Sequence, residues 1–215
     1  MFQGITQWLW QRDRGSVALP VVTACSLLLT YGSTAYALDE SDLKRLIETN
    51  ECPGCDLQAA DLRRLDLSGA NLEGANLEGA NFFYAVLDGA NLSGADLRFS
   101  NLAYVSALPR LSDALDSSGR RLEFPALFVG ANLERALLTY ADFSGADMQE
   151  ANFFEAYVFS TRFLGSQLQR TNFDATLVHD VDLRGANLCG STYWGGNDYR
   201  RACNVPVTDI DDMDE

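Results

Sequence analysis

Positive charge is scarce in this chain of 215 residues, which carries 16 basic residues against 30 acidic residues and a single histidine. The formal net charge of −14 argues against direct nucleic-acid binding, because a surface that follows a phosphate backbone needs clustered Lys and Arg. No GxSxG, HExxH or phosphate-loop motif occurs in the sequence. The chain is therefore predicted not to be an enzyme and to hold no cofactor or metal.

A long uninterrupted apolar run is also missing near the N-terminus. The stretch Val17–Tyr31 is too short and too interrupted for a comfortable membrane span. It follows Arg12 and Arg14 and precedes Ala35-Tyr36-Ala37, which is the layout of a secretory signal peptide with an A-x-A cleavage site. We expect residues 1–37 to be removed and the protein to be exported to a periplasm or a thylakoid lumen. After cleavage no membrane contact is expected.

A lipid anchor is the alternative fate of this segment. Val22-Thr23-Ala24-Cys25 resembles a lipobox, which would leave a lipoprotein anchored at Cys25. However, Leu27-Leu28-Leu29 continue the apolar run beyond Cys25, whereas a lipid-modified cysteine normally closes it. Cleavage after Ala37 is therefore favoured over both the lipoprotein and an uncleaved anchor.

From Cys55 onward the sequence repeats every five residues, beginning CDLQA, ADLRR, LDLSG, ANLEG. Each repeat has an apolar residue at its centre. In most repeats Asp or Asn stands just before the centre, and Ala or another small residue stands two before it. After an interruption the pattern resumes one residue out of phase. The centres are Leu57, Leu62, Leu67, Leu72, Leu77, Phe82, Leu87, Leu92, Leu97, Leu102, Phe128, Leu133, Leu138, Phe143, Met148, Phe153, Val158, Phe163, Leu168, Phe173, Val178, Leu183 and Leu188.

A period of five fits neither a helix, which needs 3.6, nor a strand, which needs 2. It suits a chain that turns a corner every five residues, so that the large centre and the small residue before it both point inward. Asp or Asn before the centre can bond the backbone at the corner, and glycines such as Gly69 permit the turn. Residues twenty apart are then expected to stack in adjacent coils, with Phe143 and Phe163 in one aromatic column and Phe153, Phe173 and Tyr193 in a second.

The tandem A(D/N)LxG units resemble the pentapeptide-repeat family over residues 55–190. The resemblance implies an all-β fold, a right-handed four-sided parallel β-solenoid with four pentapeptides per coil. The repeats would make just under six coils, split into a first block at 55–104 and a second block at 126–190. At about 4.8 Å per level, the body would be roughly 25–30 Å tall.

A stacked solenoid needs caps, because its ends expose apolar side chains and open strand edges. Residues 39–49 are predicted to form a short helix in which Leu43, Leu46 and Ile47 share the face that covers the first coil, within an N-terminal cap spanning 38–54. Residues 191–215 are predicted to form a C-terminal cap and an acidic tail. The apolar residues suited to that cap are Tyr193, Trp194, Tyr199, Val205 and Val207.

The interruption, residues 105–125, is predicted to leave one wall and return to it, with a possible helical turn through Leu111 and Leu115. It places Arg110, Arg120 and Arg121 on an otherwise acidic chain, which makes them candidates for contact with a partner. In the alternative, the segment is a neutral insertion whose apolar residues simply pack on the wall. Those residues are Leu111, Leu115, Leu122 and Phe124.

Four cysteines remain after cleavage, and an even number in an exported chain indicates disulfides. Because the repeats hold the ends apart, only pairing within each end is expected, with Cys189 bonded to Cys203. Cys52 and Cys55 are either disulfide-bonded or a buried reduced pair, because Cys55 occupies a small inward position in both cases. The same separation excludes a four-cysteine zinc site. Cys52 and Cys55 have redox-motif spacing, but the expected helix lies before them, whereas a thioredoxin-like motif needs it after them.

The leading hypothesis is an exported, non-catalytic structural or protein-binding solenoid with a protein partner that the sequence does not identify. The alternatives are an acidic DNA mimic that inhibits a DNA-binding enzyme, and a thiol-redox protein that uses Cys52 and Cys55. Export would separate the protein from DNA-binding enzymes. The one histidine, His179, follows the centre Val178 and is therefore expected on the outer surface without a metal or acid–base role.

Overall fold

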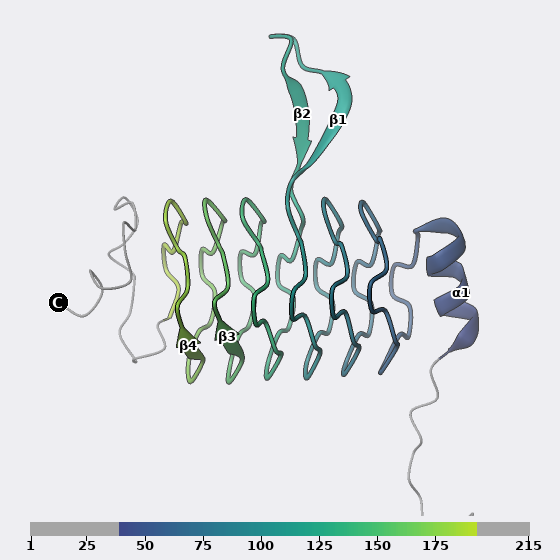
Figure 1. Ribbon diagram of the computed structural model, residues 1–215, viewed down its shortest axis with the longest axis horizontal. Coiled ribbons are helices and arrows are strands. Elements are labelled where there is room, and N and C mark those ends of the chain that lie inside the picture. The colour runs from purple at the N-terminus through teal and green to yellow at the C-terminus, as the bar shows by residue number, and fades with distance from the viewer. Residues whose placement is uncertain (1–38, 193–215) are drawn as a thin grey trace, which may run out of the picture. The chain divides into compact units, whose positions relative to one another are not determined.

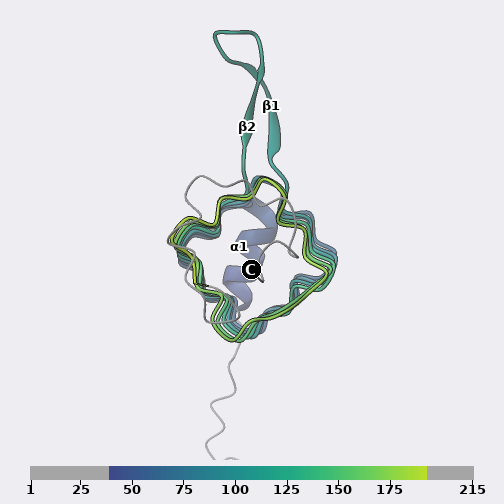
Figure 2. The ribbon, with the colours of Figure 1, turned by 90° about the vertical axis from the view of Figure 1, so that its left-hand side faces the viewer.

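The computed structural model describes residues 39–192, which form one helix and a stack of square coils (Figure 1). Each bridging residue pairs in parallel with the residue twenty positions later: Glu51 with Asn71, Asp56 with Asn76, Asp61 with Asn81, and Asp66 with Val86. One coil therefore contains four pentapeptides, and the outline seen along the stack is four-sided (Figure 2). We number the walls first to fourth by their earliest bridging residues, Glu51, Asp56, Asp61 and Asp66. The fold is the parallel β-solenoid that the repeats predict.

The interior is filled by the residue pairs that the repeat predicts. At one corner the centre Leu57 and the small residue Ala60, which begins the next pentapeptide, are both fully buried. The N–H of Ala60 donates to the carbonyl of Leu57 at 3.0 Å and closes the corner between two walls. The residue between them at the corner, Ala59, has a φ of 56°, and equivalent corners hold either glycine or another residue in this left-handed conformation.

Asp and Asn before the centre act at the corners as predicted. The N–H of Phe83 donates to Asn81 Oδ1 at 3.1 Å, and that of Ser68 donates to Asp66 Oδ1 at 3.0 Å. The same side chains also link neighbouring coils, since Asn76 Nδ2 donates to Asp56 Oδ1 at 2.9 Å. Each Asx side chain therefore satisfies local backbone and helps to hold the register between levels.

The solenoid extends further at both ends of the first block than the repeat pattern predicts. Cys52 is fully buried at a centre position, and Ala107 is buried at the centre after Leu102. Ser106 bridges Val86 on one side and Asp142 on the other, so the fourth wall continues past residue 105. The first wall has seven levels, at Glu51, Asn71, Asn91, Leu127, Asp147, Gln167 and Asn187. At about 4.8 Å per step, these levels span roughly 29 Å.

The interruption is a β-hairpin. Asn91 pairs with Leu127, 36 residues later instead of 20. Sixteen extra residues therefore leave the wall between them, and the coils after the hairpin keep the same register as the coils before it. Strands β1 (Arg110–Leu115) and β2 (Arg121–Phe124) pair antiparallel and point away from the solenoid (Figures 1 and 2). The helical turn predicted through Leu111 and Leu115 is therefore wrong. These residues instead alternate with Ser112 and Ala114 in an extended strand, which the turn at Asp116–Gly119 connects to β2.

The third wall contains the other two strands, β3 (Tyr157–Phe159) and β4 (Leu177–His179). They pair in parallel and in register, Tyr157 with Leu177 and Phe159 with His179. Inside the coils, the expected aromatic columns are present. Phe143 stacks on Phe163 with ring centroids 5.6 Å apart, and Phe153 stacks on Phe173 at 4.9 Å. Tyr193, the expected next member of the second column, lies outside the described residues, as does the rest of the predicted C-terminal cap.

Helix α1 (Glu40–Thr49) covers the first coil, as predicted. Asp39 is its N-cap and accepts a hydrogen bond from the Ser41 N–H at 2.9 Å, while Asn50 ends it in a left-handed conformation. Leu46 is fully buried against the core and Leu43 packs beside it. Ile47, predicted to share this face, is instead exposed, because the stripe of the helix that contacts the coil is too narrow to include it together with Leu43 and Leu46. No helix within residues 39–192 is long and apolar enough to cross a membrane.

Candidate functional site

The hairpin β1–β2 is the largest departure from the repeating surface, and its apolar side chains face solvent. Leu111, Leu115, Leu122 and Phe124 are between 39% and 60% exposed. None of them is buried on the wall, although Leu111 and Phe124 line a shallow depression with Gly69 and Gly89, so the alternative of a neutral insertion whose apolar residues pack on the wall is wrong in this respect. A two-stranded hairpin is marginally stable by itself, and exposed apolar side chains on both strands do not stabilise it. The arrangement is typical of a surface that becomes buried against another molecule.

The base of the hairpin rests on a column of glycines at the corner that follows the fourth wall. A Cβ atom added to Gly89 would lie 2.6 Å from Arg110 Cβ and 3.2 Å from the carbonyl oxygen of Phe124. A Cβ atom added to Gly145 would lie 2.7 Å from Pro109 Cγ. Glycine at these corners therefore lets both ends of the hairpin approach the solenoid closely. The outer part of the hairpin is consequently held at a fixed place on a rigid body.

The three candidate arginines occupy different environments. The Arg110 side chain lies along the wall over Gly69 and Gly89, in a shallow depression that Ser112 and Asp113 also line. Arg120 makes an ion pair with Asp116 at 3.4 Å across the turn of the hairpin. Arg121 begins β2 opposite Leu115 and is exposed. The structure does not bring the three together, and only Arg121 projects from the hairpin without an ion pair among the described residues.

The hairpin turn is stabilised by Asp116. Its carboxylate accepts hydrogen bonds from the Ser118 hydroxyl at 2.6 Å and from the backbone N–H groups of Ser118 and Arg120. The Ser118 hydroxyl, followed by these N–H groups, lowers the pKa of Asp116. With Asp113 and Glu123 also present, the hairpin carries as many acidic as basic residues between Pro109 and Pro125. The positively charged surface predicted for this segment is therefore limited to Arg121 and its immediate surroundings.

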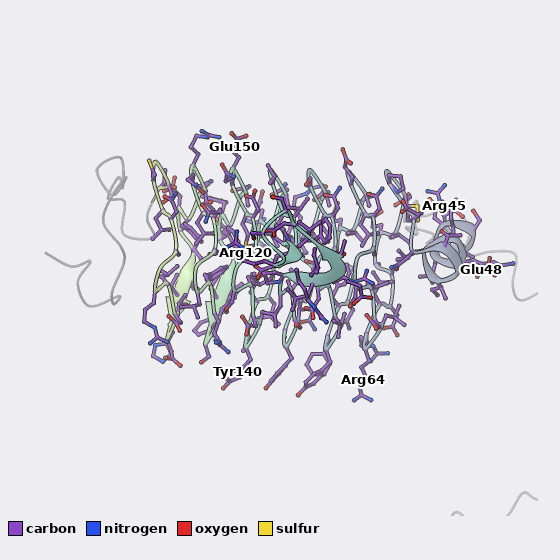
Figure 3. The ribbon with its side chains drawn as sticks, turned by 90° about the horizontal axis from the view of Figure 1, so that it is seen from above. Arg45, Glu48, Arg64, Arg120, Tyr140 and Glu150 are labelled. Carbon is purple, nitrogen blue, oxygen red and sulfur yellow. A yellow bond between two sulfur atoms is a disulfide. The ribbon has the colours of Figure 1, made fainter. Side chains whose placement is uncertain are left out.

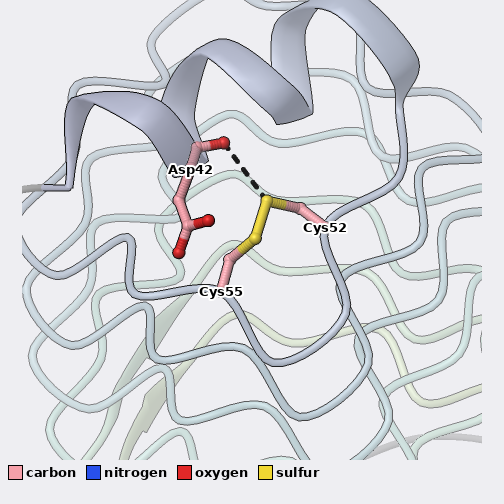
Figure 4. A group of neighbouring side chains, drawn as sticks. All are labelled: Asp42, Cys52 and Cys55. Carbon is pink, nitrogen blue, oxygen red and sulfur yellow. Dashed lines mark hydrogen bonds between the residues drawn. A yellow bond between two sulfur atoms is a disulfide. The ribbon is translucent and has the colours of Figure 1, made fainter.

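Cys52 and Cys55 lie beneath the N-terminal helix (Figure 4). Their sulfur atoms are at bonding distance, with Cα atoms 5.3 Å apart, and both side chains are buried. Cys52 Sγ lies 3.2 Å from the backbone carbonyl oxygen of Asp42, and the Asp42 carboxylate accepts from the Asp56 N–H at 2.9 Å. Asp42 thereby joins the helix to the first coil at the cysteine pair.

This geometry disfavours both redox exchange and metal binding by the pair. A small thiol or disulfide has no direct access to sulfurs that are at most 1% exposed. The Asp42, Cys52 and Cys55 side chains are close enough together to hold a metal ion. However, two sulfurs at bonding distance are not free thiolates, which are the form that ligates metals. The arrangement fits a structural link between the cap and the solenoid.

The remaining predicted residues are separate from these two regions. Cys189 lies at the end of the first wall, and its expected partner Cys203 is outside the described residues, so this pairing stays a prediction. His179 lies on the outer surface of β4 with its ring 6.3 Å from that of Phe159. A shallow depression next to it is lined by Arg162, Asp180, Asp182 and Arg184. Arg162 and Arg184 are ion-paired there with Asp142 and Asp182.

Comparison with known proteins identifies the repeat. The family model for pentapeptide repeats matches the chain in eight copies, over residues 52–83, 60–98, 75–106 and 126–153. No curated protein matches the chain.

Several solved structures resemble this fold. HetL, a pentapeptide repeat protein involved in heterocyst differentiation regulation from the cyanobacterium Nostoc, is 24% identical, with coverage of 69% of this chain and 72% of HetL and a TM-score of 0.30. A pentapeptide repeat protein from the Arabidopsis thaliana thylakoid lumen is 26% identical, with coverage of 74% and 92% and a TM-score of 0.28. QnrB1, a plasmid-mediated fluoroquinolone resistance protein, is 18% identical, with coverage of 61% and 72% and a TM-score of 0.39. With TM-scores this low, these structures support no argument about function.

Proposed function

Because this chain belongs to the pentapeptide-repeat family, we propose that it is an exported, non-catalytic protein-binding solenoid whose hairpin β1–β2 contacts the partner. The observation that carries this proposal is the exposure of Leu111, Leu115, Leu122 and Phe124 on a hairpin that projects from a filled, rigid body. Apolar side chains at a protein–protein interface supply the burial that stabilises the complex. The solenoid then serves to hold this surface in place.

A protein partner fits the hairpin better than a small ligand. The hairpin is open on both sides and forms no enclosed pocket, whereas small molecules bind in concave sites that bury most of their surface. Both strands also have an unpaired edge, to which an extended segment of a partner can add. Arg121, exposed next to the apolar residues, favours a partner with an acidic group at the matching position.

The interior of the solenoid supports a non-catalytic role. Centre residues such as Leu97 and Phe128 are fully buried, and the coils enclose side chains instead of a substrate cavity. The outer depressions at Arg110 and at Arg162 are shallow, and charged side chains form part of the lining of each. Enzyme sites usually combine a deep apolar pocket with convergent polar groups. Binding through an exposed surface is the function that this architecture supports best.

Export is supported by the sequence layout of residues 1–37 and by the cysteine pair. In an oxidising compartment Cys52 and Cys55 are expected to be disulfide-bonded, which matches their position at bonding distance. Intact-mass measurement of the exported protein should give a chain that begins at Leu38. Recovery of a chain lipidated at Cys25 would contradict the proposed processing.

The hairpin can be removed without disturbing the register of the walls. Deletion of residues 109–124 removes the 16 extra residues and joins Leu108 to residue 125 within one regular pentapeptide. Residue 125 would then occupy a corner that requires a positive φ, which proline cannot adopt, so the deletion is combined with Pro125→Gly. The shortened solenoid should fold with an unchanged circular dichroism spectrum.

Partner capture from an extract of the exported fraction tests the proposal. The wild-type protein should retain a partner that the hairpin-deleted protein loses, and the double variant L122S/F124S should reproduce the loss with the hairpin still present. Arg121→Glu should weaken capture without abolishing it, because a charge at the edge of an interface mainly changes the association rate. If the hairpin-deleted protein folds normally and captures the same partner with equal yield, the binding surface lies elsewhere.

A further inference from the structure

The outer surface of the third wall carries apolar residues over three consecutive levels at the position before the centre, whereas the other walls have only the single exceptions Val86 and Leu127 there. In its first three levels the residue before the centre is Asp61, Asn81 or Asn101, as the repeat requires. In the next three levels the same outward position is occupied by Leu137, Tyr157 and Leu177, all exposed. Side chains at this position do not contribute to the core, so the change of residue type is not explained by folding.

Three tyrosines extend this apolar surface along the corner that follows the third wall. Tyr84 and Tyr104 stack with ring centroids 4.6 Å apart, and Tyr104 and Tyr140 stack at 5.0 Å. We call Tyr84, Tyr104 and Tyr140 the tyrosine ladder. All three project from the solenoid and are exposed, and Tyr140 and Arg64 mark the same edge of the stack in Figure 3. Tyr104 and Tyr140 lie on adjacent levels, because the coils keep the same register on both sides of the hairpin.

The ladder is maintained at a conformational cost. All six corner residues that follow the third wall have positive φ, and none is glycine: Arg64, Tyr84, Tyr104, Tyr140, Ser160 and Asp180. At the next corner, after the fourth wall, the five left-handed residues are all glycine: Gly69, Gly89, Gly145, Gly165 and Gly185. A left-handed conformation costs a residue with a Cβ about 1–2 kcal/mol. Non-glycine residues such as Ala59 and Arg135 also occupy left-handed corners after the second wall, so what distinguishes the corner after the third wall is that three successive levels carry tyrosine.

The order of residues along this corner is self-complementary when it is read in the opposite direction. The corner runs Arg64, Tyr84, Tyr104, Tyr140, Ser160, Asp180, one residue per level. If a second copy is placed antiparallel, with the centre between Tyr104 and Tyr140, then Arg64 meets Asp180. Tyr84 meets Ser160, and Tyr104 meets Tyr140. The three contacts are an ion pair, a hydrogen bond between hydroxyls and an aromatic stack.

The two charged ends are available for such contacts. Arg64 is exposed and makes no ion pair within residues 39–192, whereas its neighbour Arg63 is paired with Asp61 at 2.6 Å. Asp180 is exposed and accepts a hydrogen bond from the Ser160 hydroxyl at 2.9 Å, but has no ion-pair partner in the same part of the chain. Each end therefore presents an uncompensated charge, and the two charges have opposite signs.

From this pattern we propose that the third wall and the tyrosine ladder form the interface of an antiparallel two-fold dimer of this chain. The six exposed apolar side chains, Tyr84, Tyr104, Leu137, Tyr140, Tyr157 and Leu177, are 37–54% exposed. At about 200 Å² for each side chain they offer roughly 500 Å². A stable interface buries about 800 Å² per partner, of which a little more than half is apolar. The third wall and the tyrosine ladder together supply that apolar share.

Charge also favours a second copy as the occupant of this surface. Two chains with a formal charge of −14 repel each other as whole molecules. The proposed contacts along the corner add no like-charge pair, because Arg64 pairs with Asp180 twice, once at each end, and the tyrosines and Ser160 between them are neutral. A two-fold interface uses the same patch on both copies, which is the arrangement that this self-complementary order requires.

Sedimentation velocity of the exported protein over a range of concentrations tests the proposal. The wild-type protein should form a dimer. Arg64→Asp and Asp180→Arg should each weaken it by about tenfold or more, because each creates two like-charge contacts. The double variant R64D/D180R should restore the dimer, which a folding defect would not do. Tyr104→Asn, which keeps a residue suited to positive φ, should also weaken the dimer.

Two controls separate this interface from the hairpin. Arg121→Asp makes the same charge change on the hairpin and should leave the dimer unchanged, as should the deletion of residues 109–124 with Pro125→Gly. A protein that stays monomeric at all concentrations would overturn the proposal. So would a dimer that tolerates Tyr104→Asn and both single charge reversals, because its interface would then lie on another surface.

Discussion

Phe153 and Phe173 stack inside the solenoid with ring centroids 4.9 Å apart and ring planes inclined by 18°, one coil apart in the sequence. Phe143 and Phe163 form the parallel column at 5.6 Å, and Phe163 also contacts Phe153 edge to face at 6.1 Å. The second block of coils is therefore held together by aromatic side chains that contact one another both along and across the core.

Phe163→Ala should lower the free energy of unfolding by about 3–5 kcal/mol, because it removes a fully buried ring and leaves a cavity between two levels. Denaturant unfolding followed by circular dichroism measures this change. Leu164→Ala is the matched control, since Leu164 is the next residue, lies outside the core and is 38% exposed, and it should change stability by less than about 1 kcal/mol. Equal effects of the two substitutions would mean that Phe163 contributes little to the core.

The sequence predicts the fold of this chain because the pentapeptide pattern is local and repeated. Each pentapeptide combines three elements: a small residue, then Asp or Asn, then an apolar centre. Together they determine the corner, the two inward side chains and the Asx hydrogen bonds of one wall, and each further pentapeptide repeats this local structure. The pattern failed to include Cys52 and Ala107. Cys52 lacks the usual residues around it, and at Val105 and Ala107 the large and the small inward residues exchange places.

The candidate sites were less predictable, because they depend on where single walls differ from the repeat. Leu111 and Leu115 are spaced as in a helical turn and equally as in a strand, and nothing local distinguishes the two. The ladder of Tyr84, Tyr104 and Tyr140 has an interval of 20 residues and then of 36, so it emerges only when the coil register across the hairpin is known. A search for unusual residues at the corner position of each wall would have found it.

Reduction of the Cys52–Cys55 pair should destabilise the N-terminal end of the solenoid. A disulfide that closes so short a loop contributes about 2 kcal/mol, and here it also anchors the first coil beneath α1. Unfolding in the presence and absence of a reductant measures the difference. The double variant C52A/C55A should lose the sensitivity to reductant that originates at this end of the chain.

Peptide mapping of the non-reduced protein should recover Cys52 linked to Cys55 and Cys189 linked to Cys203. The second pair closes a longer loop and should contribute about 3 kcal/mol. A peptide that links Cys52 or Cys55 to Cys189 would be incompatible with the stack, because these cysteines lie near opposite ends of the seven levels of the first wall.

Acid should destabilise the protein through its paired aspartates. The Asp96 carboxylate accepts hydrogen bonds from the Arg98 guanidinium at 2.7 and 2.8 Å, and this pairing lowers the pKa of Asp96. A carboxyl whose pKa is lower in the folded state stabilises the fold above its unfolded pKa of about 3.9, and that contribution is lost as the pH falls through the folded pKa. Stability should therefore be nearly constant from neutral pH to about pH 5 and should fall below about pH 4.

Asp96→Asn isolates this contribution. Asparagine keeps the oxygen that accepts from the Arg98 N–H at the corner but does not titrate. Unfolding measured at a series of pH values should show a smaller loss in acid for the variant than for the wild type, and Arg98→Gln should also reduce the loss because it removes the cation. An unchanged loss in both variants would show that other carboxylates determine the acid limit.

Gly89→Ala should displace the base of the hairpin, and Gly94→Ala is its matched control. Both glycines are corner residues with nearly equal φ, +65° and +66°, so both substitutions incur the cost of a left-handed alanine, about 1 kcal/mol. Around Gly94 no atom lies within 4 Å of an added Cβ, whereas at Gly89 the methyl group would meet Arg110 Cβ at 2.6 Å. Hydrogen exchange should therefore accelerate in β1 and β2 for Gly89→Ala alone, and partner capture should fall with it. If both variants exchange at the same rate in the hairpin, the glycine column does not hold it in place.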